Sequence, residues 1–97
     1  MQHIGVHIQN DKGKPVEESE INFADVMKIV YEVADYKNKL PLLSTVDPYD
    51  DTLFNSLQII QLIEELKELP SSNRVIEDSI VFLSKVGQSQ YVEFYGD

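Results

Sequence analysis

The amino-acid sequence predicts an α+β fold: a small two- or three-stranded antiparallel sheet with three helices packed on one face. The chain alternates apolar and polar residues near its start and has an aromatic, β-branched run near its end, both typical of strands. Between them, apolar residues recur at helical spacing in separate stretches. At 97 residues, the chain is expected to form a single domain over residues 1–97.

The N-terminal segment predicts a β-hairpin. Its first strand has the period of a strand with one buried face, whose apolar residues are Ile4, Val6 and Ile8. A turn follows at residues 10–13, where Gly13 can adopt the left-handed conformation. The second strand, at about residues 14–18, contains Pro15, which lacks an amide donor. We therefore expect that strand at an edge of the sheet.

The first predicted helix spans about residues 23–36. Asn22 is positioned to cap it, and apolar residues recur along one stripe. The stripe consists of Phe23, Val26, Met27, Val30, Val33 and Ala34. Residues 37–51 have no clear period, and we expect the apolar side chains of this long connection to hold it against the core. Those side chains are Leu42, Leu43 and Val46.

The second predicted helix begins at a cap on Asp51 or Thr52 and ends before Pro70. Its apolar stripe is broad, and Glu64 and Glu65 are expected on the solvent side. The stripe consists of Leu53, Leu57, Ile59, Ile60, Leu62, Ile63 and Leu66.

A third helix and a closing strand complete the predicted fold. Ser71, Ser72 and Asn73 offer caps for the helix, and Gly87 is placed to end it. The run at residues 91–95 is typical of a strand, and its obvious partner is the N-terminal strand.

The chain is strongly acidic. Seventeen acidic residues against eight basic ones give a formal net charge of −9. Phosphate backbones and anionic membrane surfaces repel such a chain, so we expect neither nucleic acid nor membrane as a partner. The charge either serves solubility alone or marks a surface that docks on a basic protein.

The absence of cysteine and the distribution of apolar residues exclude further classes of protein. Cysteine is absent, which excludes disulfides, thiolate metal sites and a cysteine nucleophile. The N-terminus shows no secretory-signal pattern, and charge interrupts every strongly apolar stretch before about 18 residues. The simplest interpretation is a soluble, cytoplasmic protein.

The densest polar cluster lies at residues 47–52, Asp-Pro-Tyr-Asp-Asp-Thr. Two interpretations of it remain open. Asp47, Asp50 and Asp51 are oxygen ligands of the kind that calcium or magnesium prefers. They are equally suited to forming turns and capping the helix that follows. The spacing does not match an EF-hand loop, and the sequence assigns no metal or cofactor.

No catalytic constellation is recognisable. His3 and His7 share one face of the predicted strand but lie about 13 Å apart, too far to share a metal ion, and both are expected at the surface. The serines and threonines lack a nucleophile-elbow or Ser-x-x-Lys pattern. The four glycines are too scattered to cradle a phosphate. We therefore do not expect an enzyme.

The tyrosines offer a second kind of candidate, because tyrosine is common among the anchor residues of protein interfaces. Tyrosine also lies comfortably at the edge of a hydrophobic core. We expect Tyr31 and Tyr91 at the core edge and Tyr49 and Tyr95 as contact residues.

Three segments share a further pattern. They are residues 47–55, Asp-Pro-Tyr-Asp-Asp-Thr-Leu-Phe-Asn, the acidic helical segment 61–66, and the closing run 91–97, which ends in Gly-Asp. This pattern resembles a set of small bacterial proteins of unknown activity that carry a D-P-Y-G-D-T-x-F-N segment, so Asp50 stands where glycine is expected. The resemblance covers roughly the C-terminal half. It implies that the Asp-Pro-Tyr loop and the terminal Gly-Asp lie near each other, and it implies no activity.

Three functions are consistent with these observations. We expect a non-catalytic protein-binding or regulatory domain that acts through an acidic surface, as an immunity protein or antitoxin does when it neutralises a basic partner. The alternatives are a small-ligand or divalent-metal site centred on residues 47–52, and a self-associating structural module that uses the apolar stripe of residues 53–66. The candidate binding residues are Asp47, Tyr49, Asp50, Asp51, Tyr95 and Asp97.

Overall fold

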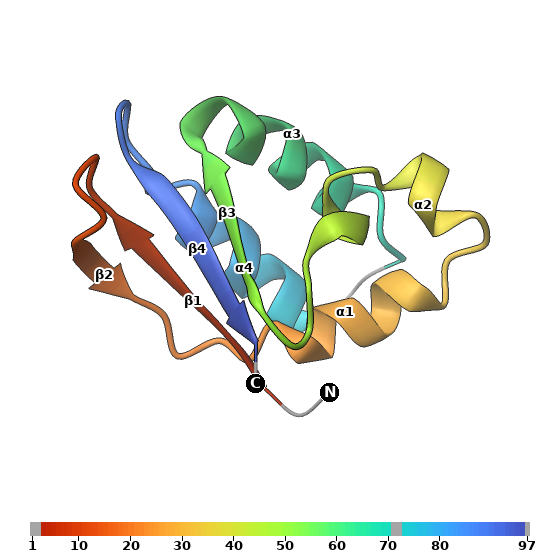
Figure 1. Ribbon diagram of the computed structural model, residues 1–97. Coiled ribbons are helices and arrows are strands. Elements are labelled where there is room, and N and C mark those ends of the chain that lie inside the picture. The colour runs from red at the N-terminus through yellow and green to blue at the C-terminus, as the bar shows by residue number, and fades with distance from the viewer. Residues whose placement is uncertain (1–2, 71–72, 97) are drawn as a thin grey trace.

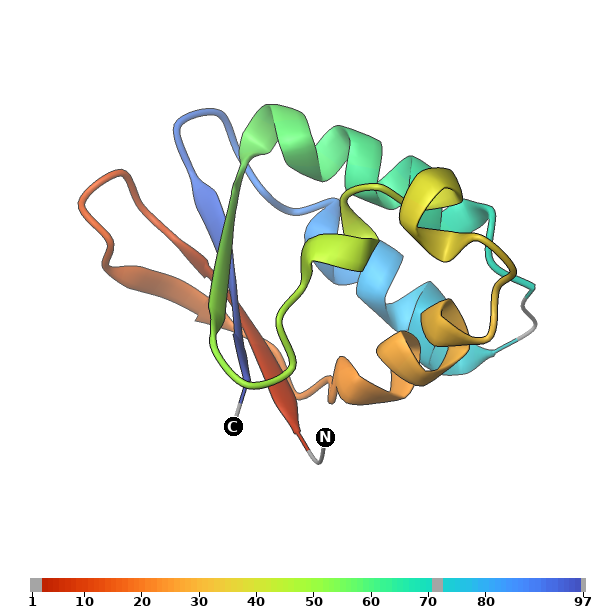
Figure 2. The ribbon, with the colours of Figure 1, turned by 45° about the vertical axis from the view of Figure 1, so that its right-hand side comes forward.

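The computed structural model describes residues 3–70 and 73–96, and these residues form one sheet layer and one helical layer (Figure 1). The described residues contain four antiparallel strands in the order β2-β1-β4-β3, namely β1 (Ile4–Gln9), β2 (Pro15–Glu18), β3 (Asp51–Asn55) and β4 (Tyr91–Gly96). Their helices are α1 (Ala24–Tyr31), α2 (Tyr36–Lys39), α3 (Ser56–Lys67), α4 (Arg74–Leu83) and the short 3₁₀ helix η1 (Leu43–Thr45). Figure 2 shows the helices on one face of the sheet.

The predicted α+β class is confirmed, with one more strand and one more α-helix than the upper prediction within the described residues. The N-terminal hairpin forms, and β2 lies at a sheet edge as Pro15 predicted. β4 pairs antiparallel with β1 along its length, from Ile4 opposite Gly96 to Gln9 opposite Tyr91. The start of β1 and the end of β4 therefore meet at one end of the sheet.

The predicted helix cap at Asp51 or Thr52 is wrong, because these residues lie in β3 and α3 begins after it. The helix starts at a capping box instead. The Asn55 side chain accepts the backbone amide of Gln58, and the Gln58 side chain accepts the backbone amide of Asn55. This cap leaves the preceding residues extended, so they pair with β4 and bury Phe54.

The first helix is shorter than the predicted span. It ends at Tyr31, and the chain turns at Asp35, whose φ of 58° is left-handed. The short helix α2 follows this turn. Asn22 precedes the cap position, and its Oδ1 accepts the backbone amides of Ala24 and Ile4. One side chain thus connects the start of α1 to β1.

The hydrophobic core lies between the sheet and the helices. The ring of Phe94 in β4 packs on Phe23 and Phe54, with centroid distances of 4.6 Å and 5.6 Å. The predicted apolar faces of β1, α1 and β4 are buried, including Ile4, Val6, Ile8, Val26, Met27, Val30 and Val92. Leu43 and Val46 are also buried, which confirms that the connection after α2 is held against the core.

Helix α3 departs from its predicted faces. Leu57 and Ile60 belong to the expected apolar stripe but are 75% and 62% exposed. Glu65 is expected on the solvent side but is buried. Its carboxylate accepts the backbone amides of Leu42 and Leu43. These hydrogen bonds orient α3 with Glu65 toward η1, and the stripe residues on the far side of the helix are consequently exposed.

The start of α4 agrees with the sequence prediction. The Asn73 side chain accepts the backbone amide of Val75 and caps the helix. Ser71 and Ser72, the other predicted caps, lie outside the described residues. Among the helices of residues 3–70 and 73–96, none has the length and apolar character needed to cross a membrane.

Candidate functional site

The loop from Asp47 to Asp51 is fixed by hydrogen bonds to its own side chains. Asp47 Oδ1 accepts the amide of Tyr49 at 2.8 Å, and Asp50 Oδ1 accepts the amide of Asp51 at 2.8 Å. The hydroxyl of Thr52 accepts the amide of Asp47 at 3.0 Å. Short side chains that bond to nearby amides in this way stabilise a turn. Two of the predicted acidic residues therefore have a structural role in addition to any binding role.

The end of β4 packs directly against this loop. The Gly96 amide donates to the Asp50 carbonyl at 3.1 Å. A side-chain carbon on Gly96 would collide with the carbonyl of Pro48, so only glycine allows this close approach. The expected proximity of the Asp-Pro-Tyr loop and the terminal glycine is confirmed. Asp97, a predicted binding residue, lies outside the described residues.

An open hollow of about 490 Å³ lies beside the loop. Tyr31 from α1, Tyr36 from α2, and Asp47 and Tyr49 from the loop line it. The rings of Tyr31 and Tyr36 meet edge to face, with centroids 5.3 Å apart. Tyr49 is 69% exposed. The hollow therefore presents aromatic rings next to a carboxylate.

The surroundings of Tyr31 raise the pKa of its phenol. Burial is the first cause that raises its pKa above the ordinary value, and the neighbouring Tyr36 and Asp47 raise it further. An ordinary tyrosine is also protonated at physiological pH, so this hydroxyl is an uncharged donor and acceptor there, and the Asp47 side chain lines the same hollow.

The acids of this loop have no cationic partner among the described residues: no ion pair involves Asp47, Asp50 or Asp51. Four of the basic residues are paired with other acids, in the pairs Lys28–Asp25, Lys67–Glu64, Arg74–Asp78 and Lys85–Glu17. Within residues 3–70 and 73–96, no three acidic or histidine side chains are grouped closely enough to hold a metal ion. Within the described residues, no ion pair therefore neutralises the carboxylates of this loop.

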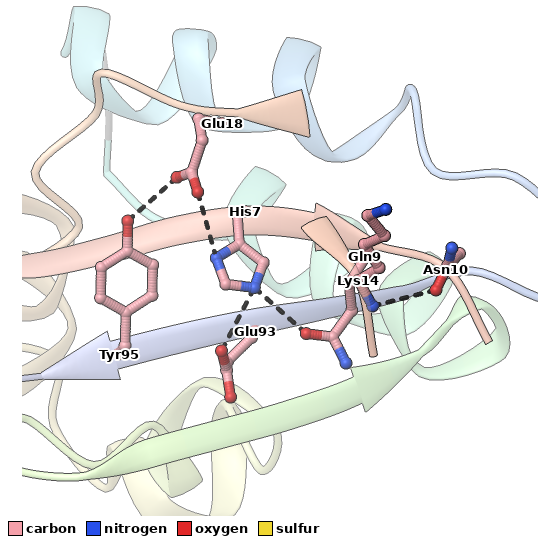
Figure 3. Close-up of polar contacts among 7 residues, drawn as sticks. All are labelled: His7, Gln9, Asn10, Lys14, Glu18, Glu93 and Tyr95. Carbon is pink, nitrogen blue, oxygen red and sulfur yellow. Dashed lines mark hydrogen bonds and ion pairs between the residues drawn. The ribbon is translucent and has the colours of Figure 1, made fainter. Parts of the chain in front are cut away.

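A second polar cluster lies on the face of the sheet opposite the helices (Figure 3). The expectation that His7 lies at the surface is wrong, because this residue is only 8% exposed. Its Nε2 lies 3.2 Å from Glu93 Oε1 and 3.1 Å from Gln9 Oε1, and its Nδ1 lies 3.6 Å from Glu18 Oε1. Acceptor oxygens from three strands therefore surround one imidazole.

Tyr95 covers this cluster. Its ring crosses over Gly5, where a side-chain carbon would collide with the ring, and its centroid lies 5.3 Å from that of His7. The hydroxyl donates to Glu18 Oε2 at 3.1 Å. Burial first, and then the hydrogen bond to Glu18, raise the pKa of Tyr95. The predicted contact residue Tyr95 thus packs with His7 and not with the hollow.

The histidine cluster is suited to joining strands. Both ring nitrogens of His7 face side-chain oxygens of the protein, from Glu18 in β2 and from Glu93 and Gln9 in β4 and β1. Cross-strand register creates the cluster, because Glu18 of β2 and Glu93 of β4 both lie opposite His7 of β1. Alternation within one strand reveals the face of a residue but not its partner on the next strand, which is why sequence reasoning missed the cluster.

These features define an α+β domain with two separate polar regions. One is the acidic loop beside a tyrosine-lined hollow, and the other is a covered histidine cluster on the sheet. Of the predicted binding residues, Asp47 and Tyr49 meet at the hollow, Asp50 and Asp51 continue the loop into β3, and Tyr95 belongs to the other region. No protein-family model, curated protein or solved structure matches this chain.

Proposed function

We propose that this protein is a non-catalytic binding domain whose 47–51 loop docks on a basic protein partner, in the manner of an immunity protein or antitoxin. One observation carries the proposal. Tyr49 is 69% exposed and is surrounded along the loop by Asp47, Asp50 and Asp51, none of which has an ion-pair partner among the described residues. Tyrosine provides a large contact area at low entropic cost, and unpaired carboxylates attract a cationic surface.

The construction of the loop supports the same function. Side-chain hydrogen bonds fix its turns, and Gly96 of β4 packs against Pro48. Binding costs less conformational entropy when the loop is already fixed than when the loop must become ordered in the complex. A preorganised acidic loop therefore favours fast, salt-sensitive association with a basic surface.

Affinity capture from the native cell lysate tests the proposal. The wild-type chain is compared with a loop variant carrying Asp47→Asn, Asp50→Asn and Asp51→Asn, in which asparagine keeps the turn-forming hydrogen bonds. The matched control carries Glu32→Gln, Glu68→Gln and Glu77→Gln, three other acids that lose the same total charge. We expect a stoichiometric basic protein that is retained by the wild type and the control, lost from the loop variant, and released by salt.

Two results would count against this function. A partner that the loop variant and the control both retain would bind elsewhere on the protein. Equal loss from both variants would indicate that only the total charge matters, and not the loop.

We propose self-association as a second candidate function, because a specific observation favours it. Leu53 at the edge strand and Leu57 and Ile60 on α3 are 50%, 75% and 62% exposed. Leu57 and Ile60 also line a hollow of about 360 Å³ with Ile63 and Val86. Exposed apolar side chains that line a hollow in this way occur at protein interfaces.

Salt separates the two candidates. Self-association must bring together two chains of charge −9, so screening should strengthen it, whereas screening should weaken docking on a basic partner. Sedimentation of the wild type and of Ile60→Gln across a salt series measures the effect. A wild-type monomer at high concentration and high salt would exclude self-association.

A further inference from the structure

The tyrosine-lined hollow has features that a general acidic surface lacks. Tyr31, Tyr36 and Tyr49 reach it from three segments, the end of α1, the start of α2 and the 47–50 loop. None of their three hydroxyls makes a hydrogen bond to another described residue. The Asp47 carboxylate uses Oδ1 to hold the turn, and no hydrogen bond to Oδ2 is found in the described part of the chain. Aromatic rings and free oxygen acceptors thus line one open space.

We infer that this hollow binds an arginine side chain of the basic partner, an inference that rests on the proposed function. The guanidinium stacks against the tyrosine rings and donates to Asp47 Oδ2. A cation over an aromatic ring is attracted by the negative face of the ring. The carboxylate adds a charge-assisted hydrogen bond, which is stronger than a neutral one.

Guanidinium fits this hollow better than ammonium does. The guanidinium group is planar and carries five N–H donors, so it can stack on a ring while donating to the carboxylate and to the phenol oxygens. It is also less strongly hydrated than an ammonium group and therefore easier to move from water to an aromatic surface. The volume of about 490 Å³ accommodates a side chain of this size in an open, solvent-connected site.

Titration of the 97-residue chain with short peptides tests the inference. Three acetylated and amidated tetrapeptides are compared, in which the repeated residue is arginine, lysine or citrulline, the last being a neutral analogue of arginine with the same shape. Binding is followed by NMR shifts of the tyrosine ring protons and by intrinsic tyrosine fluorescence, which tryptophan does not obscure because the chain has none. We expect the arginine peptide to bind more tightly than the lysine peptide, and the citrulline peptide not to bind.

Variants then locate the binding. Asp47→Asn keeps the turn and removes the charge, and we expect it to lower affinity for the arginine peptide about tenfold. Tyr49→Leu removes an exposed ring and should weaken binding several-fold without affecting folding. The matched control is Asp11→Asn, which removes the same charge from the β1–β2 turn at the opposite end of the sheet.

Several outcomes would overturn the arginine site. They are equal affinity for the arginine and lysine peptides, an equal loss of affinity in Asp47→Asn and Asp11→Asn, and ring-proton shifts confined to Tyr91 and Tyr95. Binding of the captured partner to the variants distinguishes a failure of the arginine site from a failure of the proposed docking function. A partner that is lost from the triple loop variant but bound normally by Tyr49→Leu would overturn the arginine site and leave the docking function intact.

Discussion

Gly96 packs directly against the backbone of the acidic loop. A methyl group at this position would collide with the backbone of Pro48, and backbone atoms cannot move aside as a flexible side chain can. We predict that Gly96→Ala lowers the free energy of unfolding by about 1–3 kcal/mol, the usual cost of overpacking. Denaturant unfolding monitored by circular dichroism measures this change.

Gly87→Ala is the matched control for this substitution. A methyl group at Gly87 would meet only the end of the Gln90 side chain, which accepts the Gly87 amide at 2.7 Å and needs to shift by only a few tenths of an ångström to make room. We expect the control to change stability by less than about 0.5 kcal/mol. Equal effects of the two substitutions would show that Gly96 does not hold the loop.

Tyr31 and Tyr95 give the protein a predictable response to alkali. Both have pKa values raised above the ordinary value, chiefly by burial. The folded state therefore binds the phenol protons more tightly than the unfolded state does. Below about pH 10 both states keep these protons and the contribution to stability is complete, and it is lost as the pH rises through the folded-state pKa.

Phenolate absorbance during an alkaline titration measures this effect for Tyr95. The difference between the wild type and Tyr95→Phe isolates the titration of that one phenol, and we expect its midpoint above about 10. The melting temperature should fall over the same range of pH, and it should fall less steeply in Tyr95→Phe. A midpoint at the ordinary value would contradict the partial burial of Tyr95 and its hydrogen bond to Glu18.

At the scale of single residues, sequence patterns identified the acidic loop but not its neighbours. Asp47 and Tyr49 stand out because turn formers, acids and an aromatic residue occur together in a few positions. Tyr36 gave no such signal, because its place in the hollow depends on the turn at Asp35. His7 was missed for a similar reason: its partners come from two other strands and become visible only with the register of the sheet.

Helix α3 is anchored to η1 by one buried carboxylate. Glu65 is 6% exposed and accepts hydrogen bonds from the amides of Leu42 and Leu43 and from Gln61. Removing it would leave buried backbone donors unpaired. We predict that Glu65→Ala lowers the free energy of unfolding by about 2–4 kcal/mol, while Glu65→Gln, which keeps one acceptor, costs about 1–2 kcal/mol.

The preceding residue on the same helix provides the control. Glu64 is exposed and pairs only with Lys67 at the surface, so Glu64→Ala should change stability by less than about 0.5 kcal/mol. Denaturant unfolding of the three variants ranks these effects. Similar values for Glu64→Ala and Glu65→Ala would contradict the anchoring role of Glu65.

At the scale of elements, the sequence predicted the strands that have long apolar patterns, but it did not predict where one short element ends and the next begins. The alternation of β1 and the aromatic run of β4 gave the correct strands and their pairing. β3 was missed because its residues also fit the helical stripe that continues into α3, and only the capping box at Asn55 separates strand from helix. The same ambiguity placed Leu57 and Ile60 in the core, although the anchoring of Glu65 turns them outward.

At the scale of the whole molecule, the charge of −9 opposes folding through repulsion between acids. Sodium chloride screens this repulsion, so we predict a melting temperature that rises with salt and then levels off. The neutralised loop variant, with Asp47→Asn, Asp50→Asn and Asp51→Asn, should start from a higher melting temperature and respond less to salt. Differential scanning calorimetry across a salt series measures both effects.

Calcium distinguishes general screening from a specific site on the loop. A bound ion adds stabilisation by mass action on the native state, beyond any effect of ionic strength. Because the loop carboxylates Asp47 and Asp50 already hold its turns, we predict that calcium chloride and sodium chloride of equal ionic strength give the same melting temperature. A larger rise with millimolar calcium, absent from the loop variant, would instead establish the divalent-metal alternative at residues 47–52, and the acids that attract a basic partner would then be metal ligands.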